Sequence, residues 1–280
     1  MGELPKRVAT GMVLVGVAVA ALWLGGLAFA ALASAAVLVM WAEWAAMHRL
    51  ALLVRRVGLV VLGGTMLLAM LGDWISALLL LAAAAGIGGL FFFQMRQPMV
   101  DVNGHSGLQS GRLGLDRRFL IGLLYCGLPG IALIWLRAAP WGFFATLFVM
   151  AVVWGADIAA YFTGRAVGGP KLAPAISPNK TWSGATGALV GALLVAAAMA
   201  VIWPGYGNFA GLGRLVVLAL PLAILSILGD LYESWLKRRA GVKDSGTLLP
   251  GHGGVMDRLD GLVPAAVAGA GAFAGTGWAG

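Results

Sequence analysis

The sequence predicts an all-α polytopic membrane protein with about nine transmembrane helices. Of its 280 residues, 61% are hydrophobic and only 11% are charged, whereas a soluble globular domain carries roughly 25% charged residues. Apolar stretches long enough to cross a bilayer also recur from Val8 to the C-terminus. So few charges cannot cover a water-facing surface of this size, and we therefore exclude a soluble domain with a single anchor.

Nine apolar stretches are compatible with crossings of roughly 20 residues. The expected spans are 9–27, 29–47, 57–72, 75–93, 119–136, 141–163, 184–203, 215–233 and 262–279. Five of them fall in an N-terminal half, residues 1–140. The C-terminal half, residues 141–280, carries the motifs described below and is predicted to be catalytic.

The distribution of basic residues predicts the orientation of the spans. With a cytoplasmic N-terminus, 17 of the 19 Lys and Arg residues fall in inside segments, and only Arg137 and Arg214 fall outside. Cytoplasmic loops of membrane proteins are enriched in Lys and Arg. We therefore expect the N-terminus in the cytoplasm and the C-terminus outside. The net charge of +8 then belongs to a cytoplasmic face suited to anionic lipids and solutes rather than to nucleic acid.

Acidic residues concentrate near the ends of the later spans. An ionised carboxylate inside a membrane costs a few kcal/mol unless it is paired or binds a cation, so such residues are functional candidates. Six of the eleven acidic residues are of this kind: Asp157, Asp230, Glu233, Asp244, Asp257 and Asp260.

Two polar clusters precede the richest one. In "WGADIAAYFTGR", Asp157 shares a helical face with Tyr161, and Arg165 lies one turn further on; the alternative role is an Asp–Arg pair that fixes helix packing. In "SPNKTWSG", Lys180 and Thr181 stand where they can donate to phosphate oxygens near a helix N-terminus. The alternative for this lysine is simple solvation beside the membrane.

The third cluster begins with "LGDLYESWLKRRAGVKD". Asp230, Ser234 and Lys237 follow at helical spacing along one stripe, with Glu233 beside Ser234. The helix breaks at Gly241, and "PGHGG" then offers bare backbone N–H groups that can form an anion nest.

A further helix is expected to begin near Val255, with Asp257 and Asp260 one turn apart and Arg258 between them. Carboxylates from two helix ends, facing each other across a glycine-rich loop, suit a hard divalent cation such as Mg²⁺. The pattern favours phosphoryl or nucleotidyl transfer at the cytoplasmic surface. A structural salt-bridge cluster and an ion-coupled transporter remain the alternatives.

These residues resemble the signature of the phosphatidate cytidylyltransferases (CDP-diacylglycerol synthases). The match runs over 234–260 with every spacing kept, and the resemblance as a whole covers roughly 154–261. It comprises Ser234, Lys237-Arg238, Lys243-Asp244, Ser245-Gly246, the "PGHGG" loop, Asp257-Arg258 and Asp260.

The resemblance implies transfer of CMP from CTP to phosphatidate, with Mg²⁺ as cofactor and an additional monovalent or second divalent ion as an option. It implies an enzyme of phospholipid biosynthesis in a bacterial inner membrane, with CTP, phosphatidate and membrane lipids as partners. A CTP-dependent enzyme acting on another lipid phosphate or an isoprenoid fits the same signature. A homodimer is compatible with the sequence, which does not specify the oligomeric state.

Roles follow residue by residue from the resemblance. Asp230 and Asp257 are the expected metal ligands, with Asp260 as an additional or indirect one. Phosphates would be held by basic side chains, and Asp244, His252 and Asp260 complete the expected catalytic set. The basic residues are Lys237, Arg238, Lys243 and Arg258. The expected substrate-binding residues are Asp157, Ser177, Lys180, Thr181, Ser234, Gly251, Gly253 and Gly254. The chain departs from the family at Ser183, where a glutamate is usual.

Overall fold

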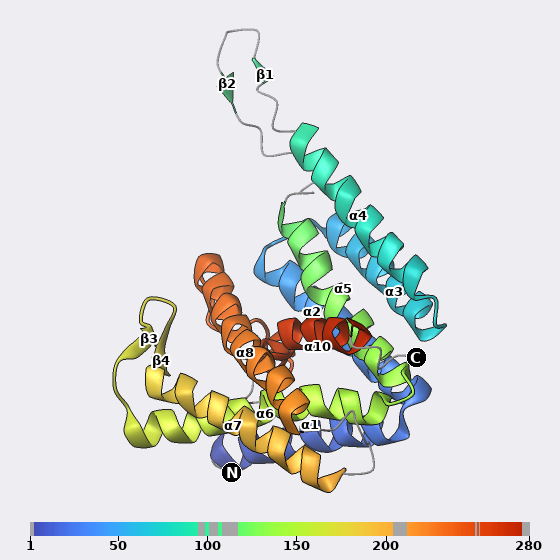
Figure 1. Cartoon of the computed structure of the whole chain (residues 1–280). Helices are drawn as coiled ribbons and strands as arrows, with labels where there is room; N and C mark the ends of the chain where they lie inside the picture. Colours follow the sequence, from blue (N-terminus) through green and yellow to red (C-terminus); the bar gives the residue numbers. More distant parts are fainter. Residues whose placement is uncertain are drawn as a thin grey trace.

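The computed structural model describes residues 3–94, 99–100, 106–107, 117–203, 212–249, 251 and 253–275. The predicted all-α architecture is confirmed, because helices make up almost all of this part of the chain (Figure 1). Their bounds are α1 Glu3–Leu24, α2 Gly26–Met47, α3 Leu52–Met70, α4 Trp74–Gln94, α5 Arg117–Ala138, α6 Gly142–Val167, α7 Trp182–Ile202, α8 Leu212–Ala240, α9 Met256–Leu259 and α10 Leu262–Gly275.

The helices account for every expected span, although not every helix is long enough to cross. Six of them, α2, α3, α5, α6, α7 and α8, have the length and hydropathy of a membrane span. Within the residues whose side chains the structure describes, α1, α4 and α10 contribute the shorter apolar segments Thr10–Leu24, Trp74–Gly89 and Leu262–Gly275. The 14 residues of α10 correspond to about 21 Å at 1.5 Å per residue, less than the roughly 30 Å hydrocarbon core. A polytopic membrane protein is therefore confirmed, while nine crossings stay a prediction.

Two short hairpins were not predicted. β1 (Met99–Val100) pairs with β2 (Ser106–Gly107), and β3 (Lys171–Ala173) pairs antiparallel with β4 (Ser177–Thr181). In the second region we expected a helix N-terminus, which the start of α7 provides, but no strands. Instead β4 runs directly into α7, and the Thr181 hydroxyl accepts a hydrogen bond of 3.1 Å from the Gly184 N–H as the helix N-cap.

Glycines let α6 and α7 pack closely along their length (Figure 1). A Cβ on Gly191 would meet the Gly155 carbonyl oxygen and stand 2.6 Å from the Ala159 Cβ. A Cβ on Gly187 would stand 3.0 Å from the Ala159 carbonyl oxygen. Small residues allow such backbone approach where lipid supplies no hydrophobic driving force between helices.

Two buried tryptophans fix one end of the N-terminal helices. The Trp41 indole N–H donates to the Arg55 carbonyl at 3.0 Å, and the Trp44 indole N–H donates to the Arg118 carbonyl at 2.9 Å. The end of α2 is thereby tied to the beginnings of α3 and α5. These ends were predicted to share the cytoplasmic side, so the packing is consistent with the expected topology.

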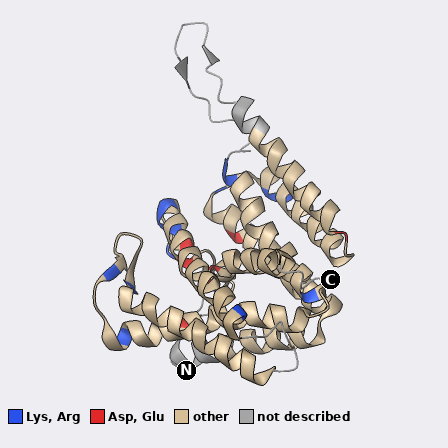
Figure 2. Cartoon of the chain, viewed as in Figure 1, with Lys and Arg blue, Asp and Glu red and all other residues tan. Residues whose placement is uncertain are grey.

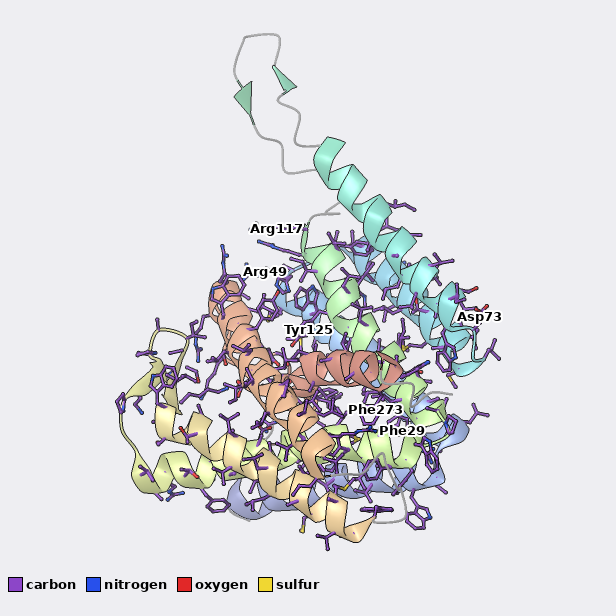
Figure 3. All side chains as sticks on the ribbon, in the orientation of Figure 1. Phe29, Arg49, Asp73, Arg117, Tyr125 and Phe273 are labelled. Carbon is purple, nitrogen blue, oxygen red and sulfur yellow. The ribbon has the colours of Figure 1, made fainter. Side chains whose placement is uncertain are left out.

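The short helix α10 lies among α5, α6 and α8, with Phe273 inside the bundle (Figure 3). The segment that leads into α10 passes close to Gly229 of α8. A Cβ at Gly229 would meet the Asp260 carbonyl oxygen and stand 2.8 Å from Pro264. Because Gly229 has no side chain, Asp260 can approach the part of α8 that carries Asp230.

We predict that Gly191→Ala destabilises the protein by about 1–3 kcal/mol, the usual cost of overpacking. The matched change Gly63→Ala should be neutral or stabilising, because a Cβ at Gly63 meets nothing within 4 Å and alanine favours a helix. SDS titration of the purified variants measures both effects. Equal stability of the two variants would contradict this packing.

Candidate active site

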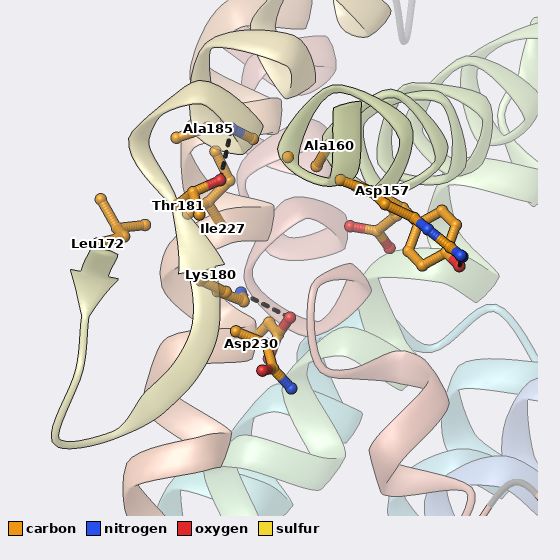
Figure 4. A pocket seen from close by; sticks show the side chains of 13 residues that line it. Asp157, Ala160, Leu172, Lys180, Thr181, Ala185, Ile227 and Asp230 are labelled. Carbon is orange, nitrogen blue, oxygen red and sulfur yellow. Dashed lines mark hydrogen bonds and ion pairs between the residues drawn. The ribbon is translucent and has the colours of Figure 1, made fainter. Parts of the chain in front are cut away.

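A cavity of about 550 Å³ opens between α6, α8 and the β4–α7 junction (Figure 4). Its wall combines apolar side chains with a few polar ones from distant parts of the sequence. The polar lining includes Asp157, Tyr161, Arg165, Asn179, Lys180, Thr181 and Asp230. Pockets that bind small molecules have this composition.

The cavity brings the first two polar clusters together with the beginning of the third. The Lys180 ammonium lies 2.6 Å from Asp230 Oδ2, and the Ser234 hydroxyl donates to Asp230 Oδ1 at 3.3 Å. Asp157 extends from α6 into the same space (Figure 4). The hairpin carries Lys180 to this position, so the unpredicted strands serve to place a predicted residue.

Three neighbouring residues have contacts that the sequence left open. Arg165 donates to the Tyr161 hydroxyl at 2.8 Å, in place of the alternative pair with Asp157. Ser183 donates to the Gly168 carbonyl, so it ties the beginning of α7 to the end of α6. Ser177 begins β4 and is not part of the cavity wall.

A second cluster centres on Asp257 at the beginning of α9. Lys237 of α8 donates to its Oδ1 at 2.6 Å. Its Oδ2 accepts from the Ser245 N–H at 2.9 Å and from the Gly254 N–H at 2.8 Å. Burial alone would raise the pKa of Asp257, but these hydrogen bonds outweigh burial and hold the pKa below its usual value.

Lys237 serves two carboxylates at once. Besides Asp257, it lies 3.0 Å from Oε1 of the fully buried Glu233. That contact is an ion pair without hydrogen-bond geometry, because neither oxygen of Glu233 accepts a hydrogen bond from the described residues. The predicted stripe on α8 therefore divides. Asp230 lines the cavity and accepts from Ser234, whereas Lys237 pairs with Glu233 and Asp257.

Asp260 links the two clusters. It lies between α9 and α10, where its carboxylate accepts the Gly261 N–H at 2.8 Å. Burial raises the pKa of Asp260, and the nearby charges of Asp230 and Asp157 raise it further. Asp260 thus carries buried negative charge that an added cation would offset, and Lys180 is the ion-pair partner of the neighbouring Asp230.

These carboxylates fit a magnesium ion better than a zinc ion. Among the described residues, no three His, Cys, Asp or Glu side chains come together as a complete metal site. Mg²⁺ needs no such cage, since it takes one or two carboxylates, several waters and substrate phosphates. Asp230 and Asp260 can supply the carboxylates. The expected direct role of Asp257 as a metal ligand stays a prediction.

The remaining signature residues lie on the surface around the cluster. Arg238, Lys243, Asp244, Gly251 and Arg258 are exposed. Figure 2 shows the basic residues at the C-terminal end of α8 and on the β3–β4 hairpin. His252 lies outside the described residues. Gly253 has a φ of +81°, and a Cβ there would stand 2.7 Å from Asp257 Oδ2, so glycine is required for the loop to pass Asp257.

Glu43 is the residue that sequence reasoning missed. It lies on α2, is 8% exposed, and accepts hydrogen bonds of 2.8 Å from the N–H groups of Val255 and Met256. The signal was available, because Glu43 is an acidic residue inside the expected span 29–47, and such residues are functional candidates.

A family model decides the affiliation. The model described as "Cytidylyltransferase family" matches residues 5–273, nearly the whole chain. The chain belongs to this cytidylyltransferase family. The resemblance inferred from the signature is thereby confirmed, and the match extends into the N-terminal half, which the signature alone did not reach.

Relatives in the family carry one name. A phosphatidate cytidylyltransferase of Pseudomonas aeruginosa is 37% identical over 94% of both chains. Proteins of that name from Brucella suis and Haemophilus influenzae are 59% and 46% identical over 52% and 44% of this chain. The matched stretch spans about half the length of these last two relatives, 53% and 43% respectively.

We predict that Lys237→Met lowers the free energy of unfolding by about 3–5 kcal/mol, because it leaves two buried carboxylates without their shared cation. Lys243→Met removes an exposed charge and should cost less than about 0.5 kcal/mol. SDS titration compares the two variants. Similar losses in both would argue against the Lys237 ion pairs.

Proposed function

We propose that this protein transfers CMP from CTP to phosphatidate, giving CDP-diacylglycerol and pyrophosphate. The observation that carries the proposal is the convergence of Asp157, Lys180 and Asp230 at one cavity beside the cytidylyltransferase signature. The names of the family and of its relatives support the same reaction.

The reaction suits the groups present. A phosphate oxygen of phosphatidate attacks the α-phosphorus of CTP and forms a new P–O bond. The bond from that phosphorus to the bridging oxygen breaks, and pyrophosphate leaves with the electron pair. Because the attacking oxygen is already anionic, no strong general base is needed, and the protein acts mainly by positioning and charge stabilisation.

The chain supplies positive charge on two sides of the carboxylates. Lys180 reaches the cavity from β4, and Arg238, Lys243 and Arg258 lie around the signature loop. We propose that they hold the triphosphate and the lipid phosphate, with His252 and its glycines shaping the nucleotide pocket. Thr181 and Asp157 complete the cavity wall.

We propose Asp230 and Asp260 as the residues that hold Mg²⁺. When bound, the ion would neutralise phosphate charge and favour departure of pyrophosphate. Asp257, whose oxygens accept from Lys237 and from loop N–H groups, would instead hold Lys237 and the loop in place. A second ion stays a prediction.

We place the active site on the cytoplasmic face of a bacterial inner membrane, with nine crossings, an inside N-terminus and an outside C-terminus. The basic-residue distribution and the shared position of the ends of α2, α3 and α5 support this orientation. The division into variable and catalytic halves at about residue 140, and a homodimer, are further proposals.

The activity is tested with purified protein, labelled CTP, Mg²⁺ and phosphatidate. We expect a lipid-soluble cytidylylated product, and Asp230→Asn should lower kcat/KM by about 100-fold because charge stabilisation of this kind contributes several kcal/mol. The charge-matched control Asp73→Asn, on an exposed loop between α3 and α4, should stay within about twofold of the parent.

Failure of the parent to form product, under conditions where a relative is active, would overturn the proposed function. Product formed only with a polyprenyl phosphate would replace phosphatidate as the substrate while keeping the chemistry. Full activity of Asp230→Asn would remove Asp230 from the site.

The proposed orientation predicts which introduced cysteines react from outside. In intact spheroplasts, Asp73→Cys should react with a membrane-impermeant maleimide, whereas Lys243→Cys should react only after permeabilisation. The native Cys126 is fully buried, so its background is expected to be low. The reverse labelling pattern would invert the topology.

A further inference from the structure

The Glu43 carboxylate receives hydrogen bonds from three groups of the signature loop. Its Oε1 accepts from the Val255 N–H at 2.8 Å, and its Oε2 accepts from the Met256 N–H at 2.8 Å. The Ser245 hydroxyl lies 3.1 Å from the same Oε2 and 2.9 Å from Asp257 Oδ2. Glu43 therefore contacts both ends of the loop, and Ser245 connects it to Asp257.

Two signature glycines make room for this carboxylate. A Cβ on Gly246 would stand 2.8 Å from Glu43 Oε1, and a Cβ on Gly254 would stand 2.5 Å from Glu43 Oε2. The loop thus closes around the end of the Glu43 side chain. Glycine is needed at these two positions for space.

Glu43 and Asp257 share a run of backbone N–H groups that begins at Gly254, the last glycine of "PGHGG". The N–H groups of Gly254, Val255 and Met256 follow one another in the chain and donate, in that order, to Asp257, Glu43 and Glu43. Backbone donors to a carboxylate form strong, directional bonds. These three N–H groups therefore bind carboxylates of the protein itself.

We infer that Glu43 is a positioning residue, which holds Ser245, Val255 and Met256 from the N-terminal half and thereby sets the positions of Asp257 and Lys237. The catalytic part of this inference rests on the proposed function. Glu43 lines no part of the described cavity, so it acts through the loop. Misplacement of catalytic groups by about 1 Å can cost 100-fold in rate.

The variant Glu43→Gln tests this role because its amide keeps the shape but turns one acceptor into a donor facing a loop N–H. We expect kcat to fall about 10- to 100-fold, with the KM values for CTP and phosphatidate changed less than about threefold. Hydrogen–deuterium exchange should accelerate in peptides spanning 245–257, and peptides from α7 should exchange as in the parent.

The matched control is Asp73→Asn, the same carboxylate-to-amide change on an exposed loop, which should leave loop exchange and kcat unchanged.

The double variant Glu43→Gln/Ser245→Ala should lose less kcat than the product of the single losses, since both residues act on one loop. For this comparison, multiplicative losses would contradict the link through Ser245.

The exchange measurement separates this inference from the proposed function. If the parent proves inactive as a cytidylyltransferase, faster exchange of 245–257 in Glu43→Gln still supports the positioning role. Unchanged exchange in the loop would overturn it. A variant with the parent's kcat but lower thermal stability would reduce Glu43 to a purely structural residue, and exchange that rises evenly over all helices would do the same.

Discussion

Every carboxylate that lies between apolar helices must find a partner, and this constraint shapes the functional end of the protein. An unpaired buried charge is strongly unfavourable, and removing one partner of a buried pair costs several kcal/mol. Asp257 is satisfied by Lys237 and backbone N–H groups, and Glu43 by the beginning of α9. Asp230 has Lys180. Asp260 is less well compensated, because its described hydrogen bond comes from a single backbone N–H, and that shortage is what an incoming cation would relieve.

Much of the architecture brings these partners together. The β3–β4 hairpin carries Lys180 to Asp230. Because Gly229 has no side chain, the segment that leads into α10 can approach α8. The α6–α7 contact at Gly155 and Gly191 brings Asp157 to the same cavity. The N-terminal half contributes Glu43, which bridges about 200 residues of sequence to reach the signature loop. The N-terminal and C-terminal halves are therefore linked by hydrogen bonds at the signature loop as well as by helix packing.

The sequence was sufficient for the helices, because hydropathy and length report directly on membrane crossing. It also identified the polar clusters, since Asp157, Lys180 and Asp230 do meet at one cavity. The sequence could not show which aspartate oxygens accept hydrogen bonds. The one-turn spacing of Asp257 and Asp260 indicates only that both lie on one helix face. The β3–β4 hairpin was missed because strands of three and five residues are too short to show a clear periodicity. The place of Glu43 inside an expected span marks it as a candidate, but its partners could not be predicted, because two of them are backbone N–H groups about 200 residues away in the sequence.

The central claim is that Asp230 and Asp260 face the reacting phosphates with a cation, while Asp257 holds the loop. Anomalous scattering from crystals of the protein grown with Mn²⁺ and a non-hydrolysable CTP analogue tests it most directly. We expect a manganese peak within about 2.2 Å of Asp230 and Asp260 oxygens, with Lys237 still bonded to Asp257. A peak coordinated by Asp257, with Lys237 displaced from it, would contradict the account.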